Sequence, residues 1–324
     1  AKGEGGPAFL PDGSLLFCSA RPDPDAKPDG DEEALLWLLP REGGEARVVA
    51  GRPGGVSGVV TSASGTVVLA ADTFPSSTDE ESEADTRKQR KQRKVAAILH
   101  DEYPIRYWDH DLGPARPRLF AGALGDGPEP TIALSDLTPD AKSALDDVSY
   151  DISPDGTTIA TMWNVGERGG RRTVLVLIDV TTGERRVVAG EPEVEVSAPR
   201  FSPDGTKVAF TLEPRSLPDE PGDQRVAVLD VASGEITELA HDWDRWATGG
   251  YRWTPDATAL ICVADEDGRA PVFRISVPDG AVTRLTGDPF AYSDVHVSPD
   301  GATVYALRAS FAERTAPVPS PARN

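Results

Sequence analysis

The chain has 324 residues and a formal net charge of −20, because 53 Asp and Glu residues outnumber 33 Lys and Arg residues. This charge argues against a nucleic acid or an anionic membrane as a partner, since phosphate groups are bound by basic surfaces. No apolar run reaches the roughly 18 residues that a membrane-spanning helix needs, and the N-terminal residues lack the apolar core of a signal peptide. We therefore expect a cytoplasmic protein that does not enter a membrane.

One four-residue phrase recurs along the chain. Ser-Pro-Asp-Gly is complete at residues 153–156, 202–205 and 298–301, and degenerate at residues 10–13, 62–65 and 254–257. Pro presets φ for the second position of a tight turn, Asp bonds its own backbone, and Gly supplies the positive φ that closes a hairpin. Each copy therefore predicts a turn between two antiparallel strands.

The first two units differ in the spacing of the strands after the turn. In the first unit, residues 15–17, 35–39 and 46–50 are rich in aliphatic and β-branched side chains and are predicted strands. In the second, residues 67–70 leave the turn, but the next predicted strand, 118–121, lies far downstream. Residues about 74–115 are therefore an expected insertion in the second blade, with a short helix in its middle.

The next three units repeat one order of strands, and the last does not complete it. The expected strands are 149–152, 158–163, 173–180 and 185–189, then 208–212, 226–231 and 236–239, then 259–263, 272–277 and 282–285. The sixth unit has strands at 292–297 and 303–307, followed by the Pro-rich residues 315–321. Because Pro lacks the backbone N–H that a central strand donates, this stretch cannot pair as a central strand. We expect an unfinished sixth unit.

The repeat predicts the fold class. Four strands per unit, with corresponding turn Asp residues about 44 to 52 positions apart in the later units, are typical of a propeller blade. We predict an all-β fold, a β-propeller of four-stranded antiparallel blades, with about six repeats here and seven or eight blades in the intact protein. Residues 1–324 would form one partial propeller domain.

Motifs that would carry chemistry are missing from the sequence. The nearest approach to Gly-x-Ser-x-Gly, residues 55–59, lacks the final Gly and runs into a strand. The acidic residues 23–33 fail the calcium-loop register because Lys27 takes a ligand position, so they are interpreted as a solvated loop, and no histidine has zinc-site spacing. We expect no catalytic residue, no cofactor and no metal site. His296, on an innermost strand, is either a hydrogen-bonded structural residue or a channel-lining functional one.

The insertion contains the best candidate for a recognition surface. Exposed Tyr, Trp and Arg side chains are the types that dominate binding interfaces. They cluster, with polar neighbours, at Arg106, Tyr107, Trp108, Asp109 and His110. The alternative is that the insertion packs against its own blade. The basic residues 87–94 are interpreted as a charged helix face.

The repeated turns, together with the basic residues 90–95 and the segment Tyr-Pro-Ile-Arg-Tyr-Trp-Asp-His-Asp-Leu-Gly-Pro at 103–114, carry a resemblance. The chain resembles the N-terminal propeller of acylaminoacyl-peptidase and dipeptidyl-aminopeptidase-like enzymes of the prolyl oligopeptidase family. The resemblance implies a following α/β-hydrolase domain with a Ser-Asp-His triad. It also implies a propeller that covers the active site and admits short peptides. No catalytic residue of this chain matches that triad.

Three functions are compatible with these patterns. The first is a non-catalytic gating domain of a serine peptidase, with the α/β-hydrolase domain and short peptides as partners. The second is a free-standing Tol-like propeller scaffold or binding protein without enzymatic activity. The third, a propeller enzyme with its site in the channel, would need clustered inward carboxylates or histidines, which the sequence does not place. No oligomeric state can be derived from the sequence.

Overall fold

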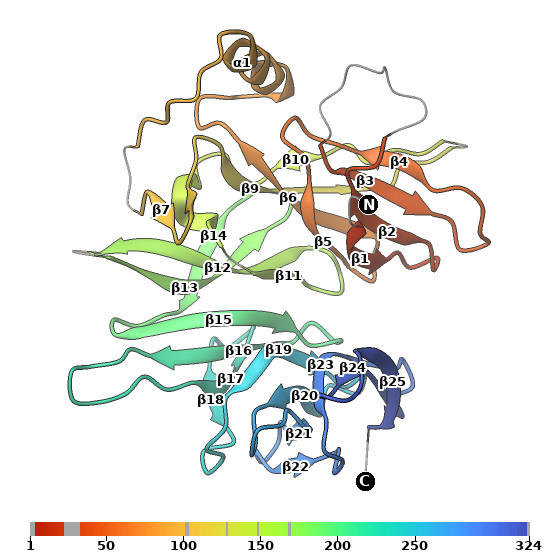
Figure 1. The fold of residues 1–324 in the computed structure, drawn as a ribbon, viewed down its shortest axis with the longest axis vertical. Coiled ribbons are helices and arrows are strands. Elements are labelled where there is room, and N and C mark those ends of the chain that lie inside the picture. Colours follow the sequence, from red (N-terminus) through yellow and green to blue (C-terminus); the bar gives the residue numbers. More distant parts are fainter. Residues whose placement is uncertain are drawn as a thin grey trace.

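The computed structural model describes residues 4–22, 33–100, 104–127, 129–147, 149–167 and 170–322. Its described part is almost entirely β, with antiparallel sheets that follow one another around a common centre (Figure 1). The predicted fold class is confirmed: the chain is a six-blade β-propeller with one short α-helix. No helix of the described residues combines the length and the apolar character needed to cross a membrane.

Each blade is one sheet whose strands follow the order of the chain. Blades 1 to 3 comprise β1 (Glu4–Phe9), β2 (Leu15–Ser19), β3 (Leu35–Leu39) and β4 (Arg47–Ala50); β5 (Ser57–Thr61), β6 (Thr66–Thr73), β9 (Arg116–Ala123) and β10 (Ser135–Asp136); and β11 (Tyr150–Ile152), β12 (Thr158–Glu167), β13 (Gly170–Asp179) and β14 (Arg185–Ala189). A short 3₁₀ helix, Lys142–Leu145, precedes β11.

The later blades repeat the same meander. They comprise β15 (Val194–Phe201), β16 (Lys207–Pro214), β17 (Arg225–Asp230) and β18 (Ile236–Leu239); β19 (Ala247–Trp253), β20 (Ala259–Ala264), β21 (Val272–Ser276) and β22 (Val282–Arg284); and β23 (Ala291–Val297), β24 (Thr303–Ala309) and β25 (Ala316–Pro321). The first strands of consecutive blades contact each other, so they form the wall of the central channel.

The six repeated turns join the first and second strands of every blade. In blade 3 the amide of Gly156 donates to the carbonyl of Ser153 at 2.8 Å, and Gly156 has a φ of +75°. The Asp155 carboxylate accepts from the Ser153 hydroxyl at 2.5 Å and from the Thr157 amide at 3.1 Å. The degenerate copy in blade 5 keeps the geometry, because Ala257 takes a φ of +55° where the others have Gly. The turn therefore works as the sequence predicts.

The hydrophobic core lies between the blades. Each of five buried clusters joins two neighbouring sheets, so every blade stabilises the next one. The largest fully buried side chains include Trp37, Phe120, Phe210 and Tyr251. Both cysteines, Cys18 and Cys262, are buried and free.

Blade 3 differs from the prediction in length. Residues 164–172 have the composition of a polar loop, but β12 extends to Glu167 and β13 begins at Gly170, with Asn164 opposite Thr173 and Glu167 opposite Gly170. The Asn164 side chain stabilises this extension, because it is buried and its amide group donates to the carbonyl of Asp146 at 2.8 Å. An ion pair between Arg172 and Glu167, 2.5 Å, stabilises its end.

Blade 6 also differs. The Pro-rich segment forms β25 and pairs with β24 over Ala316 to Pro321. Among the described strands it pairs with β24 alone, and proline is compatible with such an edge position because the missing amide need not face a neighbour. The prediction that this stretch does not pair as a central strand is confirmed, because β25 lies at the edge of the sheet. The prediction of only two strands in this unit is wrong.

The connection between β6 and β9 carries the helix α1 (Glu80–Gln92) and a small hairpin of β7 (Arg106–Tyr107) and β8 (His110–Asp111). The Asp79 carboxylate caps α1 by accepting a hydrogen bond from the Ser82 amide at 2.8 Å. In return, the Ser82 hydroxyl accepts a hydrogen bond from the Asp79 amide, which completes a capping box. Glu83, a residue of α1, is fully buried, and its carboxylate accepts from the Phe74 amide at 2.8 Å and from Arg87 at 2.7 Å. The helix is thus attached by polar contacts rather than by an apolar stripe.

Candidate functional site

The two ends of the propeller differ in their exposed side chains. One end, which we call the turn face, carries the six repeated turns; the other, the loop face, carries the connections from second to third strands and those between blades. Large exposed apolar side chains of the loop-face connections are Val95, Leu99, Ile105, Trp108, Leu217, Trp246 and Phe311. Trp108 is 99% exposed and Leu99 is 92% exposed.

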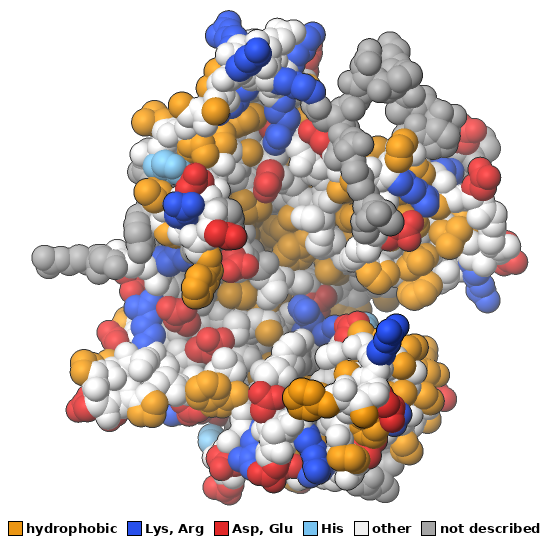
Figure 2. Space-filling view, viewed as in Figure 1, with side chains coloured by type: hydrophobic (Ala, Val, Ile, Leu, Met, Phe, Trp, Pro, Cys, Tyr) orange, Lys and Arg blue, Asp and Glu red, His pale blue; other side chains and the backbone are white. Residues whose placement is uncertain are grey.

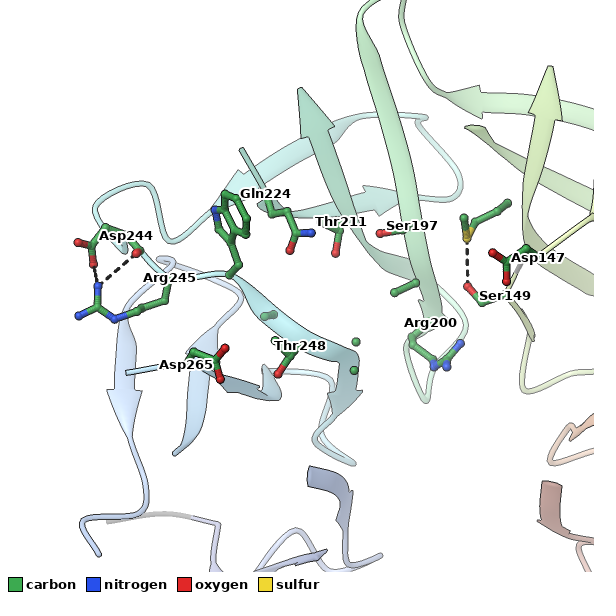
Figure 3. A pocket seen from close by; sticks show the side chains of 16 residues that line it. Asp147, Ser149, Ser197, Arg200, Thr211, Gln224, Asp244, Arg245, Thr248 and Asp265 are labelled. Atoms are coloured by element: carbon green, nitrogen blue, oxygen red, sulfur yellow. Dashed lines mark hydrogen bonds and ion pairs between the residues drawn. The ribbon is translucent and has the colours of Figure 1, made fainter. Parts of the chain in front are cut away.

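A cavity of about 840 Å³ opens at the loop face between blades 3, 4 and 5 (Figure 3). The beginnings of the innermost strands line it, through Ser149, Ser197 and Thr248, and the connection between β18 and β19 adds Trp246. The Trp246 indole donates to Asp223 at 3.2 Å, which holds the ring at the rim. The lining mixes hydroxyls, carboxylates and one exposed aromatic ring, a combination suited to a polar chain such as a peptide.

A β-bulge recurs in the innermost strands near this cavity. The register shifts between Ser197 and Arg200 in β15, and between Thr248 and Arg252 in β19. The residue four positions before each turn has a positive φ in five blades: Gly6, Gly58, Ala198, Gly250 and Asp294. Bulges redirect side chains, so the repeat places a kink of the backbone at the same level of every such strand.

A further column of equivalent residues follows each bulge, two positions before the turn. Its six members are Ala8, Val60, Asp151, Arg200, Arg252 and His296. In blades 1 and 2 the position holds Ala8 and Val60, which pack against the core between blades, whereas blades 3 to 6 have ionisable side chains there. We call this set the channel column. The carboxylates and the histidine that a site in the channel would need are thus partly present, although no single sequence motif marks them.

The charged members of the channel column lie next to one another. The Asp151 carboxylate accepts from the amide of Phe201, the neighbour of Arg200 in the chain, at 2.8 Å. Burial raises the pKa of Asp151, with Arg200 opposing that shift. Burial likewise lowers the pKa of Arg252, and the positive charge of Arg200 acts in the same direction. These groups therefore interact electrostatically across three blades.

His296 ends this column. Its side chain is 61% exposed, and Nε2 lies 3.6 Å from Oδ1 of Asp294. This exposure argues against a buried structural histidine, and a functional role in the channel stays a prediction. Among the described residues, no group of three or more His, Cys, Asp and Glu side chains is arranged to hold a metal ion. The arrangement can bind and orient a charged ligand, and it contains no assembled nucleophile and base.

The predicted recognition residues lie apart from this column, in the small hairpin. Arg106 to Tyr107 form β7, and His110 lies in β8. Arg106 pairs with Asp111, with Nε and Oδ1 3.5 Å apart, and Trp108 at the tip has a φ of +46°. Asp109 is exposed beside it.

A second cavity of about 510 Å³ lies beneath this hairpin. Its lining includes Trp108, Asp72, Arg116 and Asp146, and Asp147 lines both cavities. Arg116 and Asp146 form an ion pair of 2.6 Å. Burial raises the pKa of Asp72. The insertion thus overhangs a cavity that adjoins the channel entrance.

The acidic residues 23–33, interpreted from the sequence as a solvated loop, fall almost wholly outside the described residues.

The sequence analysis did not predict the channel column, because its members have no common chemistry. The signal that finds it is the alignment of the six turns, which brings these positions into one column. Figure 2 shows the molecule hollowed toward its centre, where the blades meet.

Short antiparallel blades arranged around a central channel define the class of β-propeller repeat proteins. The chain belongs to the TolB beta propeller domain family, which its sequence matches over residues 141–315.

Curated relatives are peptidases of which this chain matches only part. It is 25% identical to dipeptidyl-peptidase 5 of Trichophyton equinum over 211 residues, 57% of this chain and 28% of that protein. Dipeptidyl-peptidase 5 of Aspergillus fumigatus is 25% identical over 205 residues, 56% of this chain and 28% of that protein. The matched region thus spans 28% of the length of these relatives.

Solved structures share the fold. An acylaminoacyl peptidase in complex with Z-Gly-Gly-Phe-chloromethyl ketone aligns with a TM-score of 0.68 and 12% identity, covering 98% of this chain and 43% of that one. Pyrococcus horikoshii acylaminoacyl peptidase gives 0.66 and 12%, covering 97% and 43%. At this identity the likeness shows the fold alone. With the curated relatives, it confirms the resemblance to the N-terminal propellers of the prolyl oligopeptidase family.

Proposed function

We propose that this chain is the substrate-access propeller of a prolyl oligopeptidase-family serine peptidase that acts on short peptides in the cytoplasm. The observation that carries the proposal is the extent of the likeness to peptidases. The aligned fold covers 98% of this chain but 43% of an acylaminoacyl peptidase. The proposed role is thus that of a part of such an enzyme, in which the propeller selects what reaches an α/β-hydrolase domain.

The loop face supports this proposal. Its exposed apolar side chains, including Leu99, Trp108 and Phe311, are of the kind that a second domain covers. Both cavities open on the same face. A hydrolase domain seated there would close the space above the channel, exclude water and leave a narrow entrance, which favours short peptides over folded chains.

The first experiment assays the full-length gene product and the 324-residue chain side by side on dipeptidyl and acyl-aminoacyl p-nitroanilides, and on peptides of increasing length. We expect hydrolysis of short substrates by the full-length protein and none by the chain alone. Hydrolysis by the chain alone would show that it has catalytic residues of its own. A full-length product without peptidase activity would also contradict the proposal.

A second experiment tests the loop face. In the full-length protein, Trp108→Ser should loosen the contact between domains, so that longer peptides are cleaved relatively faster. Val187→Ser is the matched control, because Val187 is 63% exposed on the outer strand β14, away from the loop face. If the two variants cleave longer and shorter peptides at the same relative rates, the loop face gives no support to the proposed function.

The second candidate is a Tol-like binding protein without enzymatic activity. The observation that favours it is the match of residues 141–315 to the TolB beta propeller domain family. The two candidates differ in what the reading frame encodes after Asn324. A Gly-x-Ser-x-Gly motif on a strand-turn-helix corner supports the peptidase, whereas a stop codon at that point supports the binding protein.

A further inference from the structure

We propose that Arg200 and Arg252 form a carboxylate-binding pair in the channel, which takes the carboxylate group of an entering peptide. The peptide in this statement rests on the proposed function. The pair itself rests on the position, the partners and the surroundings of the two guanidinium groups.

The two arginines are held side by side by the repeat. They occupy equivalent positions of β15 and β19, the innermost strands of blades 4 and 5, which contact each other. The indole of Trp253, the residue after Arg252, donates to the carbonyl of Arg200 at 3.0 Å. This bond fixes the relative height of the two strands, so both side chains stand at one level of the channel.

Neither guanidinium has a carboxylate partner among the described residues. Arg200 donates to the carbonyl of Pro199 at 2.7 Å, and Arg252 to that of Tyr251 at 3.0 Å. In the part of the chain that the structure describes, no carboxylate oxygen lies within 4 Å of either group. Other arginines, such as Arg116, Arg118 and Arg215, do have such partners.

The nearby carboxylates of Asp151 and Asp294 act on Arg252 electrostatically, and each also has a partner of its own. Asp151 accepts from the Phe201 amide, and Asp294 lies 3.6 Å from His296. The repulsion between Arg200 and Arg252 lowers the pKa of Arg252 in addition to burial. A ligand anion between them would relieve this repulsion and could accept hydrogen bonds from both forks. Because Asp151 and Asp294 are close, a singly charged carboxylate suits the site better than a dianion such as phosphate.

The pair is reachable from the loop face. Arg200 lines the cavity of about 840 Å³, together with the bulge residue Ala198. Figure 3 shows its side chain between those of Ser149 and Thr248, which also line this cavity. A peptide that enters by the cavity therefore meets Arg200, and Arg252 lies at the equivalent position of the neighbouring strand.

The test measures binding to the 324-residue chain by calorimetry at low ionic strength. The probes are acetyl-trialanine with a free carboxylate, the same peptide with a C-terminal amide, and inorganic phosphate. We expect the free acid to bind at least tenfold more tightly than the amide, because a charge-assisted fork contributes about that much. Arg200→Gln and Arg252→Gln should each abolish this preference, and Arg252→Lys should retain part of it.

Arg186→Gln is the matched control, since Arg186 is exposed on the outer strand β14 and its loss changes the net charge equally. Thermal unfolding of every variant confirms that it is folded. The proposal is overturned if the wild-type chain binds acid and amide equally, if Arg186→Gln loses as much preference, or if phosphate binds as tightly as the acid.

These outcomes are separable from those of the proposed function. If the free acid binds in an arginine-dependent way but the full-length protein lacks peptidase activity, the carboxylate-binding pair is supported and the proposed substrate-access function is contradicted. If the full-length protein has peptidase activity but the chain shows no carboxylate preference, the proposed function is supported and the carboxylate-binding pair is contradicted.

Discussion

At the scale of single residues, the turn of blade 3 shows how three side chains and one backbone conformation specify a hairpin. Ser153, Asp155 and Thr157 form a closed set of short hydrogen bonds. Gly156 supplies the left-handed backbone, and its Cα faces the hydroxyls of Ser62, Ser64 and Thr66 in blade 2. The turn therefore joins two strands and also contacts the preceding blade.

Gly156→Ala tests this double role. A left-handed φ costs a residue with Cβ about 1 kcal/mol, and here the added methyl group would also displace the hydroxyls of blade 2. We expect the free energy of unfolding to fall by about 2 to 3 kcal/mol in denaturant titrations. Gly234→Ala is the control, with a φ of +77° and open space around the added methyl. Equal losses for both variants would contradict the contact between blades.

The members of the channel column cannot be recognised as a group from any single residue position. Asp151, Arg200 and His296 differ in charge and shape, so no motif search joins them. Their common register with the turns could have been read from the sequence. Their proximity could not, because it depends on how much each blade rotates relative to the last.

At the scale of elements, α1 shows a division between forming a helix and attaching it. Its acidic first turn and basic last turn complement the helix dipole, which makes the segment a predictable helix. Its attachment depends on Glu83, Arg87 and the backbone at Asp72 and Phe74. A Glu within a charged helix gives no sign in the sequence that it is buried.

Glu83→Ala should release α1 from blade 2. The variant leaves the Phe74 amide without its acceptor and Arg87 without its buried partner, at a cost of up to about 3 kcal/mol. We expect faster hydrogen exchange in residues 80–92, with unchanged exchange in the sheets of the other blades. Asp85→Ala, on the exposed side of the same helix, should leave exchange unchanged. Acceleration in both variants would mean that Glu83 does not anchor the helix.

At the scale of the whole molecule, the repetition of turn aspartates makes the propeller sensitive to acid. Hydrogen bonds from Ser153 and Ser298 lower the pKa values of Asp155 and Asp300, and bonds within the outer hairpins do so for Asp179 and Asp230. A carboxyl group whose pKa is lower in the folded state stabilises the fold above its unfolded value, about 3.9, and loses that contribution as the pH falls through the folded value.

We therefore expect the free energy of unfolding, measured with urea, to fall as the pH decreases from about 5 to about 3. Asp155→Asn should lower stability by about 1 kcal/mol at pH 7 and should show a shallower decrease in acid, because one titrating group is removed. A variant that follows the wild-type curve at a constant offset would exclude Asp155 as a contributor to the acid sensitivity.

The propeller fold, the places of the turns and most strands can be read from the amino-acid order, because alternation and turn chemistry act over a few residues and the repeat supplies them six times. Contacts between distant segments cannot. The pairing of the Pro-rich β25 at an edge, the burial of Glu83 and the approach of Arg200 to Arg252 depend on packing between elements that the chain brings together only when the blades stack.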